Sequence, residues 1–184
     1  HPVLVGSPAP DASLRTLDDQ ATTLHAQLAG KPTVLVFYRG GWCPYCNLQL
    51  SELRHLVPEL ARSGFQMIAL SPDRPLELAK TLDQHKLEYT LLSDSSASAM
   101  QRYGIAFRVD DATAAKYADY GIDLAASSGE SHQALPVASV FVIDAAGVIA
   151  FSYVNPDYRT RAPVRILRAA VEAVAAGEAG KPLK

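Results

Sequence analysis

The sequence predicts an α/β fold in which helices flank a central mixed sheet. Apolar runs at residues 33–38 and 65–71 have the composition of buried parallel strands, and leucines at helical spacing separate them. This strand–helix–strand order predicts right-handed βαβ units. Two further apolar runs, 138–143 and 148–153, are joined by a short turn, so these strands should be antiparallel neighbours. The two kinds of pairing together make the sheet mixed.

Composition limits the class of protein and its partners. The 184 residues suit a single domain spanning 1–184, and 48% are hydrophobic and 20% charged, as is usual for globular proteins. A net charge of −2 gives no reason to expect a nucleic-acid or membrane partner. No apolar run approaches the ~20 residues that span a bilayer, and no signal-peptide pattern opens the chain. Composition constrains the compartment only weakly; our expectation is a cytoplasmic protein that is a monomer or homodimer.

The N-terminal third should contain a hairpin, a strand and a long helix. Two short alternating stretches, 13–16 and 21–24, predict a small hairpin laid on the larger fold. The strand at 33–38 leads into a helix that runs to about Arg62. Pro58 lies inside this helix and removes a backbone hydrogen bond, so we expect a kink near residues 54–58.

The rest of the chain alternates between helices and strands. A helix from Pro75 to about His85 follows the strand at 65–71, and then come a strand at 89–92 and a helix at 95–103. The last helix should cover 163–176, before a polar tail at 177–184 that we expect to fray.

Residues 104–134 form an insertion with a less regular pattern. We expect a helix at 110–117 and a loop at 125–131. Long segments of this kind often cover a site or bind a partner, although poorly ordered filler is an equally simple interpretation.

Both cysteines of the chain, Cys43 and Cys46, lie where the strand at 33–38 turns into the helix. Unpaired N–H groups and the macrodipole at a helix N-terminus favour a thiolate, so we expect the pKa of Cys43 to lie below about 7.5. Pro44 fits the first helical turn, where its missing N–H would have no partner. Cys46 should lie one turn further on, near enough to form a disulfide.

Redox chemistry is the favoured interpretation of this pair. A structural disulfide would close so small a loop that it would remove little entropy from the unfolded chain. A zinc site needs four ligands, but there is no second cysteine pair and the histidines are scattered singly. We therefore expect neither a metal nor another cofactor.

The motif Phe37–Cys46, the segment Val5–Pro10 and Leu135–Val137 before the strand at 138–143 together resemble the alkyl hydroperoxide reductase/thiol-specific antioxidant (AhpC/TSA) family. The resemblance covers roughly residues 3–175. Within the family, the chain is most similar to peroxiredoxin-like proteins, here with a thioredoxin-type Cys-Pro-Tyr-Cys motif. It implies a thioredoxin fold, with Cys43 as nucleophile and Cys46 as resolving cysteine. It also implies that Pro136 is a cis-proline facing the cysteines.

The chain departs from the family pattern at three places and from the thioredoxin pattern at a fourth. Gly40 takes the position of the family's threonine, and Arg39 roughly that of its proline. The stretch 136–138 lacks the arginine that polarises peroxide in the family, and Phe37 replaces the buried acid of thioredoxins. We take Arg39 as a candidate stabiliser of the thiolate and of a peroxide oxygen, although a solvated surface residue is an equally simple interpretation.

Other side chains are candidates for supporting roles. Trp42 should shield the cysteine pair and contact a redox partner, although filling space beside the helix start is the simpler interpretation; Pro44 and Tyr45 complete the motif. His132, in the loop before Pro136, is a candidate proton donor, although a solvated loop histidine is the simpler interpretation.

Three functional hypotheses follow. The first is a thiol-dependent peroxidase acting on hydrogen peroxide or organic hydroperoxides, in which Cys43 becomes a sulfenic acid and condenses with Cys46 to a disulfide that a thioredoxin-like dithiol reduces. The alternative is a thiol–disulfide oxidoreductase that uses the same pair on protein disulfides. The third is a non-catalytic redox sensor in which the disulfide alters residues 105–134.

Overall fold

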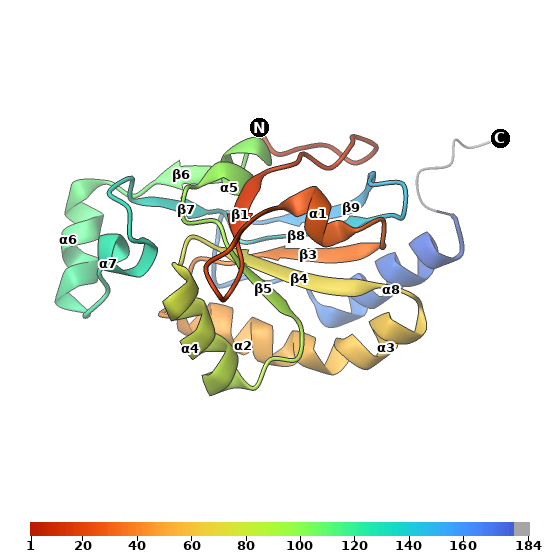
Figure 1. The fold of residues 1–184 in the computed structure, drawn as a ribbon, viewed down its shortest axis with the longest axis horizontal. Coiled ribbons are helices and arrows are strands. Elements are labelled where there is room, and N and C mark those ends of the chain that lie inside the picture. Colours follow the sequence, from red (N-terminus) through yellow and green to blue (C-terminus); the bar gives the residue numbers. More distant parts are fainter. Residues whose placement is uncertain (179–184) are drawn as a thin grey trace.

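The computed structural model describes residues 1–178 and shows a seven-stranded mixed sheet with helices on both faces (Figure 1). Its strand order is β2-β1-β5-β4-β3-β8-β9. The α/β class and the mixed sheet predicted from the sequence are confirmed. The strands of this sheet are β1 (Ser13–Arg15), β2 (Ala21–Thr23), β3 (Thr33–Phe37), β4 (Gln66–Ser71), β5 (Thr90–Ser93), β8 (Ser139–Ile143) and β9 (Ile149–Val154).

Strand β3 is central and leads directly to the cysteines. It pairs parallel with β4 and antiparallel with β8, so Phe37 lies opposite both Leu70 and Ser139. All five of its residues are buried, which explains the apolar run that follows Thr33. Because parallel strands end at the same edge of a sheet, the loop after β3 and the loop after β4 meet there.

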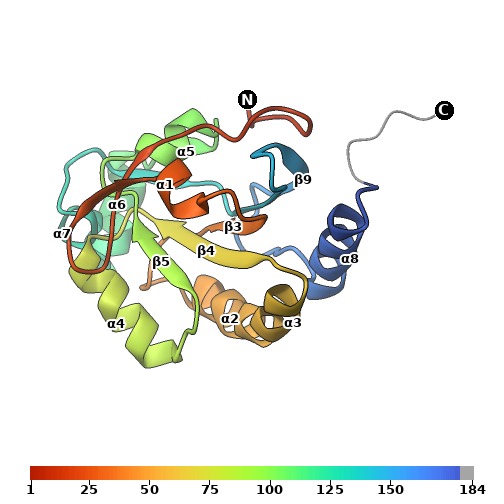
Figure 2. The same cartoon turned by 45° about the vertical axis from the view of Figure 1, so that its right-hand side comes forward.

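The helices cover the two faces unequally (Figure 2). More helices cover one face than the other. Val34 and Val36 of β3 point into the core beneath this larger set of helices, whereas Leu35 and Phe37 point into the core on the opposite face. This alternation follows from the two-residue period of a strand. The larger set comprises α2 (Pro44–Leu53), α3 (Val57–Arg62), α4 (Pro75–His85) and α8 (Val164–Ala175), and the smaller set α1 (Leu24–Leu28) and α5 (Ser98–Arg102).

The cysteine helix is interrupted where the kink was predicted. A 3₁₀ segment, η1 (Arg54–Leu56), separates α2 from α3, and Pro58 lies in the first turn of α3. Proline is well tolerated there because the first N–H groups of a helix have no intrahelical partner.

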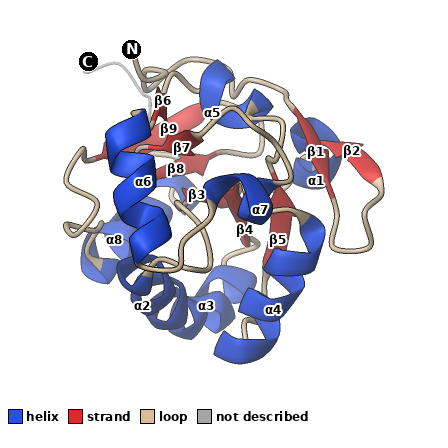
Figure 3. Ribbon diagram, turned by 90° about the vertical axis from the view of Figure 1, so that its left-hand side faces the viewer, coloured by secondary structure: helices blue, strands red, loops and turns tan. Residues whose placement is uncertain are grey.

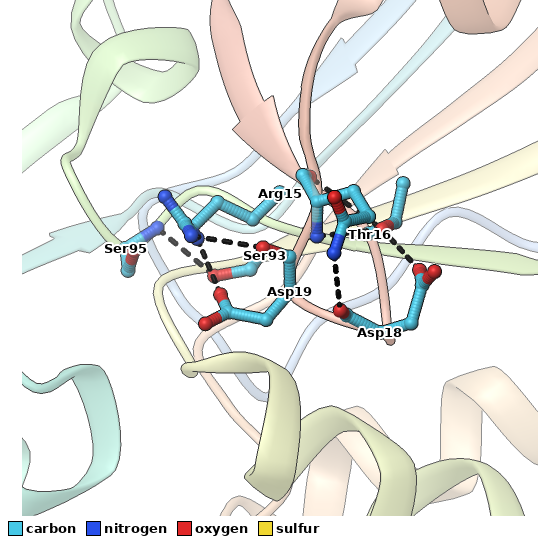
Figure 4. A network of polar contacts seen from close by, with 7 residues as sticks. Arg15, Thr16, Asp18, Asp19, Ser93 and Ser95 are labelled. Carbon is cyan, nitrogen blue, oxygen red and sulfur yellow. Dashed lines mark hydrogen bonds and ion pairs between the residues drawn. The ribbon is translucent and has the colours of Figure 1, made fainter.

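The predicted hairpin is present as β1–β2, with Ser13 paired to Thr23, and the structure places it at the edge of the sheet. Polar side chains hold its turn (Figure 4): Arg15 forms an ion pair with Asp19 and also donates to the Asp19 carbonyl oxygen at 2.8 Å. The Thr16 hydroxyl accepts the N–H of Gln20 at 3.1 Å. These bonds fix the register of the hairpin locally.

The insertion at 104–134 is more regular than expected. It contains β6 (Ala106–Arg108), α6 (Asp111–Asp119), α7 (Leu124–Ser128) and β7 (Ala134–Pro136), and β6 pairs antiparallel with β7. The prediction of a loop at 125–131 is therefore wrong for residues 125–128, which belong to α7. Asp123 caps this helix by accepting the N–H of Ala126 at 2.9 Å, and Gly129 ends it with φ 78°. Figure 3 shows α6 and α7 in front of the sheet.

The cis-proline expected at residue 136 is also wrong, because no peptide bond in residues 1–178 is cis. Pro136 instead belongs to β7 and lies opposite Ala106 in the β6–β7 pair. The trans form is the favoured one for an X–Pro bond. The tail predicted for 177–184 lies outside the described residues from 179 onward. Across the described part of the chain, none of the helices has the length and apolarity to span a membrane.

Candidate active site

Cys43 occupies the N-cap of α2, where the sequence placed it. Its backbone is extended (φ −92°, ψ 111°), Pro44 follows as the first helical residue, and Cys46 lies one turn further on. Both cysteines are free thiols, and their residues are only 2% and 0% exposed. The structure thus describes the pair with two separate thiols, both of them buried.

The environment of Cys43 favours a thiolate. Hydrogen bonds from the thiol and the backbone N–H of Cys46, together with the charges of Arg39 and Arg161, lower the pKa of Cys43 to about 6 despite burial. The pKa is therefore below the limit of about 7.5 expected from the helix start. However, the hydrogen bond from the Cys46 thiol lowers the pKa of Cys43 the most, and the backbone amides at the helix N-terminus contribute less.

Cys46 has the opposite character. Burial and the neighbouring Cys43 sulfur raise the pKa of Cys46 well above that of a free thiol. In the reduced pair, Cys46 therefore keeps its proton and donates it to the Cys43 sulfur as a hydrogen bond. This asymmetry suits Cys43 to attack first and Cys46 to react second.

We expect alkylation of Cys43 in the reduced protein to have a midpoint near pH 6. Only the thiolate reacts, so the rate should be high at neutral pH and should be lost as the pH falls through that value. Iodoacetamide labelling followed by peptide mass mapping measures it. In the control variant Cys46→Ala the midpoint should move to higher pH, because the main lowering hydrogen bond is gone. A wild-type midpoint near ~8.5, the value of an ordinary cysteine, would contradict the expectation.

Arg39 is a buried cation beside the cysteine, 4% exposed, and not the solvated surface residue that usually follows a strand. Its guanidinium carbon lies 4.2 Å from the ring centroid of Tyr158, 5.1 Å from that of Trp42 and 5.6 Å from that of Tyr117. It also donates a hydrogen bond to the Tyr117 hydroxyl. Three aromatic faces thus compensate a charge that burial would otherwise disfavour.

The aromatic residues of the motif face two neighbours. Trp42 packs on Tyr117 of α6, with ring centroids 5.8 Å apart, and Tyr45 meets Tyr158 edge to face at 5.7 Å. Tyr45 remains 44% exposed. The insertion therefore forms part of the wall of the site, and Tyr45 and Tyr158 line its outer rim.

Asp73 is a buried carboxylate at the site that the sequence reasoning missed. It lies two residues after β4 and accepts the N–H of Gly41 at 2.7 Å and the hydroxyl proton of Ser127 in α7. Burial raises the pKa of Asp73, and these hydrogen bonds oppose that effect. One side chain thus ties the cysteine loop to the insertion. The parallel pairing of β3 and β4 could have suggested it, since their carboxyl ends meet.

Arg161 is the second missed residue, and it touches the cysteines. Its Nη2 lies 3.2 Å from Cys46 Sγ and 4.0 Å from Cys43 Sγ, and its Nη1 donates to Gln49 Oε1 at 3.2 Å. It comes from the loop before α8, outside the stretch 136–138 where the family arginine was sought. No local motif in the sequence marks this position.

His132 is engaged elsewhere. One ring nitrogen contacts the carbonyl oxygen of Ser95 at 2.7 Å, and the other accepts the N–H of Ala134 at 2.8 Å. Both nitrogens thus bind backbone groups, and this geometry gives His132 a structural role in place of the proton donor considered from the sequence.

A mixed sheet of thioredoxin type that presents two free thiols at a helix start defines a thiol-dependent redox protein. Residues 5–152 match the model of the AhpC/TSA family. The chain belongs to this family, as its motifs indicated.

Two kinds of relative agree with this assignment. The chain is 30% identical over 105 residues to a putative peroxiredoxin bcp of Haemophilus influenzae, which is 57% of this chain and 67% of the relative. Among solved structures, peroxidoxin BcpB from Mycobacterium tuberculosis aligns with a TM-score of 0.70 at 19% identity, over 92% of this chain and 97% of that one. Reduced Prx3 from Vibrio vulnificus in complex with H₂O₂ aligns with a TM-score of 0.73 at 18% identity, over 91% and 99%. The thioredoxin fold predicted from the sequence is thereby confirmed.

Proposed function

We propose that this chain is a thiol-dependent peroxidase in which Cys43 attacks the peroxide and Cys46 resolves the product. The Cys43 thiolate sulfur attacks one peroxide oxygen, the O–O bond breaks, and the leaving oxygen takes up a proton to become water or an alcohol. Cys43 is then a sulfenic acid. Family membership and the peroxiredoxin relative support the peroxidase activity.

The observation that carries the proposal is the thiolate character of Cys43, whose pKa is lowered to about 6. A thiolate near neutral pH is the form that reacts with peroxide. Arg39 adds positive charge beside it, where negative charge develops on the leaving oxygen. Cys46 lies one turn away, and its thiol donates a hydrogen bond to Cys43, so the two sulfurs that would form the disulfide are neighbours.

The disulfide then needs an external dithiol. We propose a thioredoxin-like reductant, whose thiolate attacks the Cys43–Cys46 bond and passes through a mixed disulfide. The exposed rim of Tyr45 and Tyr158 supports this, because aromatic side chains are frequent in recognition surfaces.

Paired assays test the function. Peroxide consumption coupled to thioredoxin and thioredoxin reductase should be rapid, whereas insulin-disulfide reduction by the same sample should be slow. The opposite ranking would assign the cysteine pair to protein disulfides, which its Cys-x-x-Cys spacing also allows. Oxidation of the pair without turnover in either assay would favour a redox sensor.

A further inference from the structure

We infer that Arg161 is a catalytic residue of the resolving step, in which it activates Cys46 for attack on the Cys43 sulfenic acid. The inference rests on the proposed peroxidase function and adds a role for the second half of its cycle. Its basis is the asymmetric placement of the guanidinium, which lies closer to Cys46 Sγ than to Cys43 Sγ.

The geometry fixes Arg161 on the resolving cysteine. Nη2 lies at hydrogen-bond distance from Cys46 Sγ (3.2 Å), while Cys43 Sγ is at 4.0 Å. The second nitrogen, Nη1, is bound to Gln49 Oε1 at 3.2 Å. Gln49 lies on α2 one turn after Cys46 and is 5% exposed. The planar guanidinium is thus held by two neighbouring side chains of one helix.

The electrostatic problem at Cys46 explains why a cation is needed. Its sulfur is fully buried, and burial disfavours the thiolate that must attack. In the reduced protein the negative Cys43 sulfur adds to this effect. When Cys43 becomes an uncharged sulfenic acid, that repulsion disappears, and burial is left opposed by Arg161. The titratable or charged groups that face Cys46 are Cys43, Arg161 and Tyr38, which directly follows β3.

The step balances without a further reactant. Cys46 loses its proton, and the resulting sulfur lone pair forms the S–S bond with Cys43 as the S–O bond of the sulfenic acid breaks. The leaving hydroxide takes up a proton and becomes water. Cys46 sulfur is oxidised and Cys43 sulfur is reduced, so that the disulfide is the only new bond between protein atoms. Arg161 lowers the cost of the transient thiolate on Cys46.

Stopped-flow fluorescence of Trp42, the single tryptophan of the chain, can separate the two steps. Mixing the reduced protein with peroxide should give a first phase whose rate rises with peroxide concentration and a second phase that is independent of it. Arg161→Gln should slow the second phase about ten- to hundredfold, as expected for loss of a charge-assisted hydrogen bond, and change the first less than about threefold. The second phase of Arg161→Gln should also reach its full rate only at a higher pH than in the wild type. Arg161→Lys should recover most of the rate.

Arg165→Gln is the matched control, since it removes an exposed arginine from the first turn of α8 and should leave both phases unchanged.

Mass spectrometry adds a second readout, because slow resolution should let excess peroxide oxidise Cys43 to the sulfinic acid, which carries two oxygen atoms on the sulfur. The inference fails if Arg161→Gln slows both phases equally. It also fails if this variant slows neither phase. Absence of any first phase in the wild type would instead overturn the proposed function. If circular dichroism shows that Arg161→Gln is unfolded, Arg161→Lys decides. A folded Arg161→Lys that does not recover most of the wild-type rate of the second phase overturns the inference.

Discussion

Cys43→Ser is expected to abolish peroxide turnover, while Cys46→Ser should complete one stoichiometric oxidation and then stop. The reason is the division of labour between the sulfurs: the pKa of Cys43 is lowered to about 6, and that of Cys46 is raised by burial. A serine hydroxyl at residue 43 cannot supply the soft, ionised nucleophile that attacks an O–O bond. Coupled turnover and single-turnover assays measure the two outcomes.

The trapped product identifies the roles directly. In Cys46→Ser, a sulfenic-acid probe such as dimedone should label Cys43 after one equivalent of peroxide, and a mixed disulfide should form with added thiol. Wild-type protein should give the intramolecular disulfide and little label. A turnover-competent Cys43→Ser together with an inert Cys46→Ser would reverse the assignment of nucleophile and resolving residue.

Arg39→Met is expected to lower the second-order rate constant for oxidation of Cys43 by about 10²-fold, the size of effect known for removing one group that stabilises developing negative charge. The variant removes a buried cation that lowers the pKa of Cys43. It also removes the hydrogen bond to Tyr117 and so loosens α6 from the site. The initial phase of Trp42 fluorescence gives the rate constant, and the alkylation midpoint should rise in the same variant.

Tyr117→Phe separates the two effects of Arg39. This control keeps the aromatic ring that packs on Trp42 but removes the hydroxyl, so it should retain most of the oxidation rate. Arg39→Lys keeps a charge without the planar guanidinium and should lie between Met and wild type. Oxidation of Arg39→Met at the wild-type rate would show that Arg39 serves the fold and the insertion alone.

The sequence was sufficient for those elements whose local pattern is strong. Apolar runs predicted β3, β4, β8 and β9, helical spacing predicted α2, α4 and α8, and Pro58 predicted the interruption near η1. The position of Cys43 at a helix start and the lowered pKa could be inferred for the same reason. Errors arose where the signal was weak: α7 has a composition typical of a loop, and the strands of the β6–β7 pair have only three residues each.

Contacts between distant segments depended on the tertiary structure. Arg161 lies 118 positions from Cys43 in the sequence, Tyr117 lies 78 from Arg39, and Ser127 lies 54 from Asp73, yet each pair meets at the site. Periodicity reports only which face a residue takes on its own element. Which loops meet depends on strand order and helix packing, and these brought a cation to Cys46 and part of the insertion over Trp42. The sequence alone thus determined the fold class and the place of the cysteine pair at a helix start, whereas the packing of remote loops brought Arg161 to the two sulfurs.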